Sequence, residues 1–208
     1  MRKITTCLLL VLLSCATVSK EVSRELISNP DGTKEYVFYS DEKEITKQIV
    51  KGGRVIKTIG KIPDGIVKEY YKSEKLKAEW NYKNNKLEGL SKQYFESGKL
   101  MTESNLKDGK AEGLSKRYYE NGKLFVVSNY KDGKEEGKCM MYDENGMLFS
   151  ELHYRNNKLD GITNIYDESG KIRVIENYEN GKRTKRKEYD EKGNLRFEKN
   201  DTMDKEKK

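Results

Sequence analysis

Apolar and polar residues alternate along most of this chain, and short turn motifs interrupt the alternation at regular intervals. Residues 113–119 (GLSKRYY) and 123–130 (KLFVVSNY) are two such runs, separated by Glu120-Asn121-Gly122. Neither run has the 3.6-residue apolar stripe of an amphipathic helix. The pattern therefore predicts a β-hairpin with a glycine-containing turn. A second turn signal at 131–134 (KDGK) leads into the next hairpin.

The same pattern recurs every 24 residues between about residue 65 and residue 189. Four columns of equivalent positions define the repeat: a glycine, a tyrosine after it, an aliphatic residue, and a tyrosine or leucine. They are Gly65, Gly89, Gly113, Gly137 and Gly161; Tyr70, Tyr94, Tyr118, Tyr142 and Tyr166; Leu76, Leu100, Leu124, Leu148 and Ile172; and Tyr82, Leu106, Tyr130, Tyr154 and Tyr178. Repetition at a constant period of this length indicates an array in which each unit packs on its neighbours.

The columns also predict the length of the hairpin turn. A two-residue Asn-Gly loop would place Tyr118 opposite Phe125, whereas a three-residue loop would place it opposite Leu124. Because the position of Leu124 is aliphatic in every unit, we predict the three-residue loop, with Gly122 in the left-handed conformation. One apolar face is then expected to carry both tyrosine columns, the aliphatic column and the residue after the repeat glycine, which is Ile66, Leu90, Leu114 or Ile162. Lys138 breaks this last column.

The period is weak on both sides of this array, which spans residues 65–197. Residues 35–64 hold two strand-like runs, at 36–39 and 54–59, and are expected to form a degenerate N-terminal capping repeat. Residues 198–208 are almost wholly polar and are expected to be a disordered tail.

Composition supports a thin molecule. Hydrophobic residues make up 34% of the chain and charged residues 37%, against roughly 45–50% apolar residues in an average globular protein. The expected fold is therefore all-β, an elongated single-layer array of antiparallel hairpins.

The net charge is +7, but positive and negative residues are interleaved. A nucleic-acid site would need basic residues on one face with aromatic rings free to stack, so no nucleic-acid partner is expected.

The first fifteen residues, MRKITTCLLLVLLSC, have the pattern of a secretory signal. Two basic residues precede an apolar run over 7–13, which is too short to cross a bilayer as a helix. The run ends LLSC, which resembles the lipobox of bacterial lipoproteins. The resemblance implies a signal peptide over 1–14, an acylated Cys15, and a lipid-anchored place in the bacterial cell envelope, at the outer membrane or cell surface. An ordinary signal, uncleaved or cleaved elsewhere, is the alternative.

Residues 15–34 are polar, show little periodicity and contain the turn signal Asn29-Pro30-Asp31-Gly32. We expect them to be a flexible tether between the lipid and the array.

The hairpin motifs resemble a known repeat family. Residues 96–100 (ESGKL), 120–124 (ENGKL) and 130–134 (YKDGK) resemble MORN-type repeats of the bacterial variant class. The resemblance implies a twisted single layer of β-hairpins and no reaction. Proteins with such repeats are often described as antitoxin-like components of toxin–antitoxin systems, and eukaryotic arrays have been linked to membranes and scaffolding. This chain departs from the classical units because Trp80 is its only tryptophan.

No residue pattern points to catalysis. His153, the only histidine, stands in a column otherwise filled by asparagine, so it is interpreted as a polar substitution within a ladder. That asparagine column either forms hydrogen bonds between strands or binds a ligand. Cys139 is interpreted as a small strand residue. No Cys/His cluster has zinc spacing and no glycine loop has phosphate-binding form, so no catalytic residue, metal or cofactor is expected.

These observations predict a non-enzymatic, lipid-anchored module that binds a protein or glycan partner through its extended sheet. The expected contacts are the membrane, through the N-terminal lipid, and this unidentified partner, and the open sheet edges allow edge-to-edge self-association. The alternative is an intracellular antitoxin-like protein that binds and neutralises a toxin. The basic run at 182–187 is interpreted as a solvated final hairpin.

Overall fold

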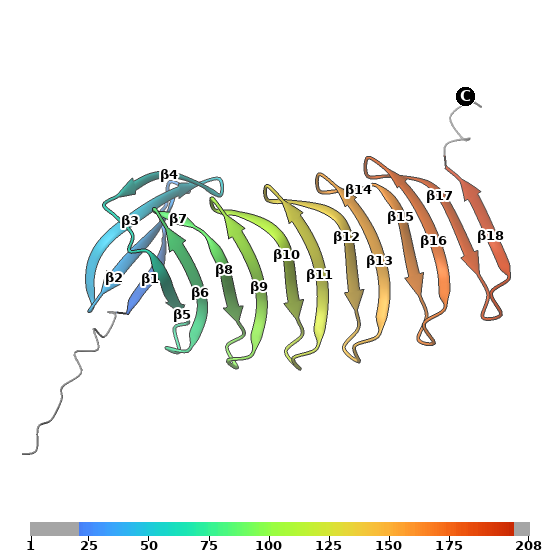
Figure 1. Cartoon of the computed structure of the whole chain (residues 1–208), viewed down its shortest axis with the longest axis horizontal. Helices are drawn as coiled ribbons and strands as arrows, with labels where there is room; N and C mark the ends of the chain where they lie inside the picture. Colours follow the sequence, from blue (N-terminus) through green and yellow to red (C-terminus); the bar gives the residue numbers. More distant parts are fainter. Residues whose placement is uncertain (1–20, 202–208) are drawn as a thin grey trace, which may run out of the picture.

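The computed structural model describes residues 21–201, and every regular element in that range is a β-strand (Figure 1). The strands form a single 18-stranded open sheet, which confirms the all-β prediction. They are β1 (Val22–Ser28), β2 (Lys34–Ser40), β3 (Lys43–Lys51), β4 (Arg54–Ile59), β5 (Gly65–Tyr70), β6 (Leu76–Lys83), β7 (Lys86–Leu87), β8 (Gly89–Tyr94), β9 (Leu100–Lys107), β10 (Lys110–Tyr118), β11 (Leu124–Lys131), β12 (Lys134–Tyr142), β13 (Leu148–Arg155), β14 (Lys158–Leu159), β15 (Gly161–Tyr166), β16 (Ile172–Glu179), β17 (Lys182–Tyr189) and β18 (Leu195–Asn200). No helix in this part of the chain is long and apolar enough to cross a membrane.

The first strand joins the N-terminal strands to the repeats. β1 pairs antiparallel with β2 and parallel with β5, where Val22 lies opposite Val67. The prediction of a flexible tether over 15–34 is therefore wrong for 22–28, which form a strand. Its pairing with β2 is local, but residues 22–28 show little periodicity and have no repeat equivalent, and the pairing with β5 joins segments more than forty residues apart.

The hairpin turns have the predicted register. Tyr118 lies opposite Leu124, the Tyr119 N–H donates to the Lys123 carbonyl at 2.8 Å, and Gly122 has a φ of 87°. A bulge follows at once, because the pairing shifts by one residue between Arg117 and Tyr118. The equivalent pairs in the other units are Tyr70 with Leu76, Tyr94 with Leu100, Tyr142 with Leu148 and Tyr166 with Ile172.

Successive hairpins are joined by two-residue turns that carry a link between repeats. In one of them Asp132 and Gly133 have φ values of 50° and 79°, the left-handed pair of a type I′ turn. The Asp132 N–H donates to the Glu112 carboxylate of the preceding unit at 2.9 Å. The same bond joins Asn84 to Asp64, Asp108 to Glu88, Asn156 to Glu136 and Asn180 to Asp160. One rim of the array is thus held by a carboxylate ladder that repeats with the sequence.

The two faces of the sheet differ from the prediction. We call inner the face that carries Val67, Trp80, Tyr82 and their equivalents, and outer the face that carries Ile66, Tyr70 and theirs, since side chains alternate along a strand. Ile66 is 58% exposed, whereas Val67 is fully buried. The prediction that both tyrosine columns and the residue after the glycine share one apolar face is therefore wrong. In each hairpin the bulge adds one residue to the second strand, so the side chains beyond it lie on the opposite face.

The buried apolar core lies at the N-terminal end, where β1–β4 gather (Figure 1). Val22, Phe38 and Ile62 pack with Val67 and Tyr82, and the rings of Phe38 and Tyr82 meet edge-on with centroids 5.5 Å apart. The N-terminal strands thus cover the inner face of the first repeat. Two hydrogen bonds fasten them to a repeat turn: Gln48 Nε2 donates to the Asn85 carbonyl at 2.9 Å, and the Ile62 N–H donates to Asn85 Oδ1 at 2.7 Å.

The C-terminal boundary also differs from the prediction. Residues 198–200, expected to begin a disordered tail, belong to β18, where Glu198 lies opposite Lys187. Asp201 forms an ion pair with Arg183, 2.7 Å from Nε. Residues 202–208 lie outside the described range.

Candidate binding face

A row of small side chains crosses the inner face from strand to strand. Ser91 lies opposite Ser104, Ser104 opposite Ser115, Ser115 opposite Ser128, and Ser128 opposite Cys139. The Ser104 and Ser115 hydroxyls are 2.6 Å apart, and Ser128 Oγ donates to Cys139 Sγ at 3.2 Å. Ser91 Oγ accepts from the Asn81 N–H at 3.3 Å, so the row forms a low floor whose hydroxyls are already hydrogen-bonded.

Larger side chains rise on both sides of this floor and form a trough. It encloses about 820 Å³ over the second and third repeats. The residues that shape it are Phe95, Met101, Tyr119 and Phe125 on one side, Leu106, Ala111 and Tyr130 on the other, and Trp80 at its N-terminal end. The Tyr119 and Phe125 rings lie 4.7 Å apart, and the Arg117 guanidinium lies 5.6 Å from the Phe125 ring. Apolar and aromatic walls without a covering layer are typical of a surface that binds another chain.

At the N-terminal end of the trough, Arg24 is the centre of a buried polar cluster. Its guanidinium lies between two rings, 4.2 Å from Tyr36 and 4.4 Å from Trp80. It donates to Glu69 from Nε at 3.1 Å and to the Tyr82 hydroxyl from Nη1 at 2.8 Å. Arg24 is therefore held in place on the inner face by charge, hydrogen bonds and stacking together.

Glu69 receives four polar contacts in this cluster. Besides the two from Arg24, it accepts bonds from Lys77 Nζ at 2.7 Å and from the Trp80 indole at 3.0 Å. Burial would raise the pKa of the Glu69 carboxyl, but these contacts outweigh burial and hold the pKa below its usual value. The side chain is consequently an anion that fixes the orientations of Arg24 and Trp80.

A second hollow, which we call the junction hollow, lies where the N-terminal strands meet the repeats. It encloses about 930 Å³ between β2–β4 and the turns that follow β6 and β9. The rings of Tyr36, Trp80 and Tyr82 line it together with Arg24. Further charged residues at its border are Lys34, Arg54, Lys86, Lys110 and Asp108. Trp80 lines both the junction hollow and the trough, so the two adjoin at that residue.

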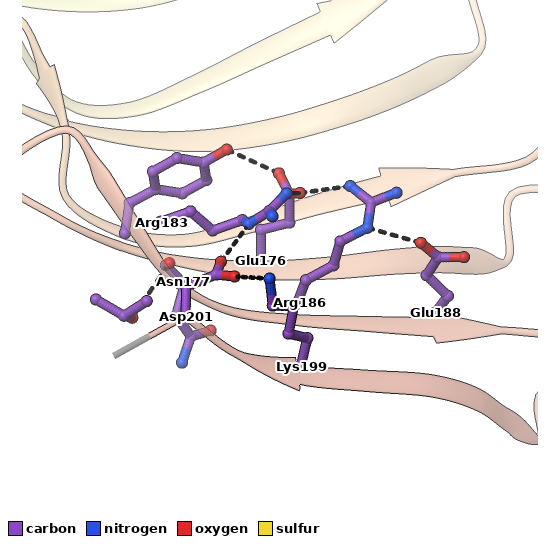
Figure 2. A network of polar contacts seen from close by, with 9 residues as sticks. Glu176, Asn177, Arg183, Arg186, Glu188, Lys199 and Asp201 are labelled. Carbon is purple, nitrogen blue, oxygen red and sulfur yellow. Dashed lines mark hydrogen bonds and ion pairs between the residues drawn. The ribbon is translucent and has the colours of Figure 1, made fainter. Parts of the chain in front are cut away.

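The inner face ends at the C-terminal side in another ionic cluster (Figure 2). Glu176 accepts bonds from Arg183 Nη1 at 3.0 Å, from Arg186 Nη1 at 2.5 Å and from the Tyr178 hydroxyl at 2.8 Å. Burial would raise the pKa of the Glu176 carboxyl, but these three bonds together lower it. Part of the basic run at 182–187, interpreted from sequence as a solvated hairpin, is therefore engaged with a buried carboxylate.

The repeat glycines lie at one structural position. Gly113 lies opposite Tyr130, at a bulge where the β9–β10 pairing shifts between Ala111 and Ser115, and its φ is 76°. The other members, Gly65, Gly89, Gly137 and Gly161, lie opposite Tyr82, Leu106, Tyr154 and Tyr178 and also have positive φ. A side chain on a strand residue with positive φ would strain the backbone, which explains why glycine occupies this column.

The two tyrosine columns have different surroundings. Tyr94 and Tyr118, on the outer face, donate to Glu79 at 2.6 Å and to Glu103 at 2.8 Å, and Tyr166 donates to Glu151 at 2.9 Å. Burial and these carboxylates raise the pKa of Tyr94 and Tyr118 to about 12. Tyr70 bonds to Glu21, whereas Tyr142 lies near Met140. The inner-face column holds Tyr82, Tyr130, Tyr154 and Tyr178, of which Tyr130 contributes to the trough.

The remaining candidate residues are engaged in contacts within the sheet. His153 is exposed, and its Nδ1 donates to the Ile162 carbonyl at 2.9 Å. Asn129 in the same column donates to the Glu136 carbonyl at 3.2 Å, so both side chains bond between strands. Cys139 is buried, and burial raises the pKa of its thiol. Within the described residues no group of acidic, histidine or cysteine side chains could hold a metal ion. Cys15 lies outside the described residues.

Sequence reasoning did not single out Arg24 or Glu69. Arg24 lies in a segment with no repeat equivalent, and Glu69 occupies a position held by Gln93, Arg117, Met141 and Ile165 in later units. The only available signal was Trp80, a lone tryptophan at a position where the next two units have the floor residues Ser104 and Ser128.

The comparison with protein families matches the repeats to one family. The family described as MORN repeat variant matches five tandem segments, at residues 63–84, 87–108, 111–132, 135–156 and 159–180. No curated protein matches the chain.

Proposed function

The chain belongs to the MORN repeat variant family, and from that premise we propose that it is a non-enzymatic binding module, anchored by a lipid on Cys15 in the bacterial cell envelope, that holds a protein partner in the trough. Members of this family are repeat modules that commonly mediate protein or membrane interactions. The anchor and the envelope location are supported by the first fifteen residues, which carry a basic start, an apolar run and the LLSC ending.

One observation carries the binding role: the inner face is covered over the first repeat and open over the next ones. The chain's own N-terminal strands bury Val67 and Tyr82, whereas the equivalent face of the second and third repeats is the trough. The N-terminal strands form a covering layer over the first repeat. An extended segment from a partner would extend this layer over the second and third repeats. It would cover the half-buried apolar walls.

The chemistry of the trough favours a protein over a glycan. Its walls are more apolar than polar: Phe95, Met101, Leu106 and Phe125 line it, together with Gln93, Thr102, Arg117 and Glu120. The floor hydroxyls of Ser104 and Ser115 already bond to each other. A sugar polymer needs free polar groups to bond its hydroxyls, whereas aromatic and methionine side chains are enriched at protein interfaces.

The test is site-specific photo-crosslinking in intact cells. A photoreactive residue replaces Ser104 on the trough floor, and the matched control places it at Leu90, which is exposed on the outer face. We expect a defined protein adduct from position 104, none from 90, and a weaker adduct when Phe125→Ala and Tyr130→Ala remove the walls. Adducts from position 90 alone, or a glycan adduct at 104, would contradict the proposal.

The anchor is tested separately. Palmitate should label the wild-type protein and not the Cys15→Ser variant, and the wild type should fractionate with membranes. An unlabelled protein in the soluble cytosol would instead favour the antitoxin-like alternative.

A further inference from the structure

We propose that the junction hollow binds an acidic stretch of the partner segment that lies in the trough, which makes the partner a protein with an acidic end to its binding segment. This inference rests on the proposed function and adds the chemical class of the ligand. It follows from the charges at the hollow, its aromatic lining and its position next to the trough, with Trp80 lining both.

The charges around the hollow are unbalanced. Five cationic side chains and one carboxylate line it: Arg24, Lys34, Arg54, Lys86, Lys110 and Asp108. Arg24 is neutralised by Glu69 and Lys86 by Asp108, at 3.0 Å and 2.6 Å. Lys34 and Arg54 form no ion pair with any described residue, and the Asp108 carboxylate, whose pKa is lowered by Lys86 and also by Lys110, is shared by these two lysines. The charges of Lys34 and Arg54 therefore attract an anion that enters the hollow.

The cations come from both layers of the junction. Lys34 and Arg54 lie at the start of β2 and of β4, whereas Lys110 begins β10 in the array. A carboxylate in the hollow would therefore be approached from two sides. Gln48 and Asn85, which also line it, are bonded to each other, so the walls of the hollow are braced where the layers meet.

The aromatic lining favours an extended chain over an isolated small anion. Tyr36, Trp80 and Tyr82 line the same space, and the Arg24 guanidinium is stacked between two of these rings. Tyr82 is buried, but the partly exposed rings of Tyr36 and Trp80 give apolar contact area to the backbone and methylene groups of an acidic peptide. Because Trp80 also ends the trough, a segment that lies along the trough reaches the hollow across this one ring.

Trp80 makes the inference directly measurable. It is the only tryptophan of the chain, so its fluorescence in the full-length protein reports on the border between hollow and trough. The probe is a ten-residue peptide of alternating alanine and glutamate, and the matched neutral peptide has glutamine in place of glutamate. We expect a saturable change with the acidic peptide, weakening with added salt, and binding of the neutral peptide at least about tenfold weaker.

Two charge variants locate the site. Lys34→Gln with Arg54→Gln should weaken binding of the acidic peptide about fivefold or more, since each exposed charge contributes modestly. The matched control is Lys131→Gln with Lys134→Gln, which removes two exposed cations from a repeat turn outside the hollow and should leave binding unchanged. Both pairs of positions are on the surface, so circular dichroism should show the same fold for all three proteins.

Several results would overturn the proposal: no binding of the acidic peptide, equal binding of both peptides, or equal effects of the two double variants. Tighter binding of a polyuronate chain or of anionic phospholipid vesicles than of the peptide would do so as well. Crosslinking from position 104 reads out the trough independently. If crosslinked adducts form but the acidic peptide does not bind, this inference is overturned and the proposed function stands. If the peptide binds but no adducts form from the trough, the proposed function is overturned and this inference stands.

Discussion

Arg24 and Glu69 form a buried ion pair, with Nη2 and Oε2 3.0 Å apart, that joins the first strand of the described chain to the first repeat. Each residue is 6% exposed. Both contact Trp80, and Trp80 ends the trough. The stability of the N-terminal strands and the shape of the binding face therefore depend on the same two side chains.

Removing one partner of this pair should be costly. Glu69→Ala leaves the Arg24 guanidinium buried without its carboxylate, so we expect a loss of about 3–5 kcal/mol in the unfolding of the N-terminal strands. Trp80 fluorescence during urea unfolding measures it. Lys68→Ala is the control, since its ion pair with Glu21 is exposed and should contribute about 0–1 kcal/mol. Equal losses in the two variants would show that the buried pair has no special role.

Acid should destabilise the same region. The pKa of the Glu69 carboxyl lies below its usual value in the folded protein, so the unfolded chain binds the proton more tightly. The resulting stability is complete above the unfolded-state pKa of about 4.3 and is lost as the pH falls through the folded-state pKa. The urea concentration at the midpoint of unfolding, followed by Trp80 fluorescence, should decrease as the pH is lowered below about 4.5. It should decrease less steeply in Glu69→Gln. Parallel pH profiles would exclude Glu69 as the group.

Deleting the first strand distinguishes a strand from a tether. Removal of 21–28 takes away Val22 and Arg24 and exposes the apolar surface of Val67. We expect a protein whose Trp80 emission is shifted to the red and whose N-terminal strands exchange amide hydrogens rapidly. Removal of 202–208, which lie outside the described range, is the comparison. An unchanged spectrum after the first deletion would restore the tether interpretation.

The repeat glycine should resist substitution for a backbone reason. Gly113 has a φ of 76°, and no atom lies within 4 Å of the place that a Cβ would occupy, so Gly113→Ala introduces strain but no clash. We expect a loss of about 1–2 kcal/mol in thermal or urea unfolding. Gly113→Asn should cost less, because asparagine tolerates the left-handed region better. An asparagine variant less stable than the alanine variant would point to a steric cause instead.

Cys139 should react slowly. It is buried next to Ser128, and burial raises the pKa of its thiol, so little thiolate forms near neutral pH. In a variant with Cys7→Ser and Cys15→Ser, a thiol reagent at about pH 8, just below the ordinary thiol pKa, should label the folded protein far more slowly than the protein in denaturant. Fast labelling of the folded protein would mean that the inner-face floor opens readily.

The sequence alone determined the repeat and its turns. The 24-residue period, the three-residue loop that places Tyr118 opposite Leu124, and the β-hairpin architecture all follow from contacts between residues near each other in the chain. Local alternation and turn chemistry are sufficient for such contacts. The resemblance of the same short motifs to MORN-type repeats was confirmed by the match to the MORN repeat variant family.

Only the tertiary structure decided which side chains face inward and what covers them. The bulge at Arg117 and Tyr118 changes the alternation by one residue, so the two tyrosine columns lie on opposite faces although their spacing suggests one. The covering of the first repeat depends on β1 pairing with β5 and on Arg24 meeting Glu69, 45 residues further along. Such a contact leaves no periodic trace, because it is made once and between segments that do not repeat.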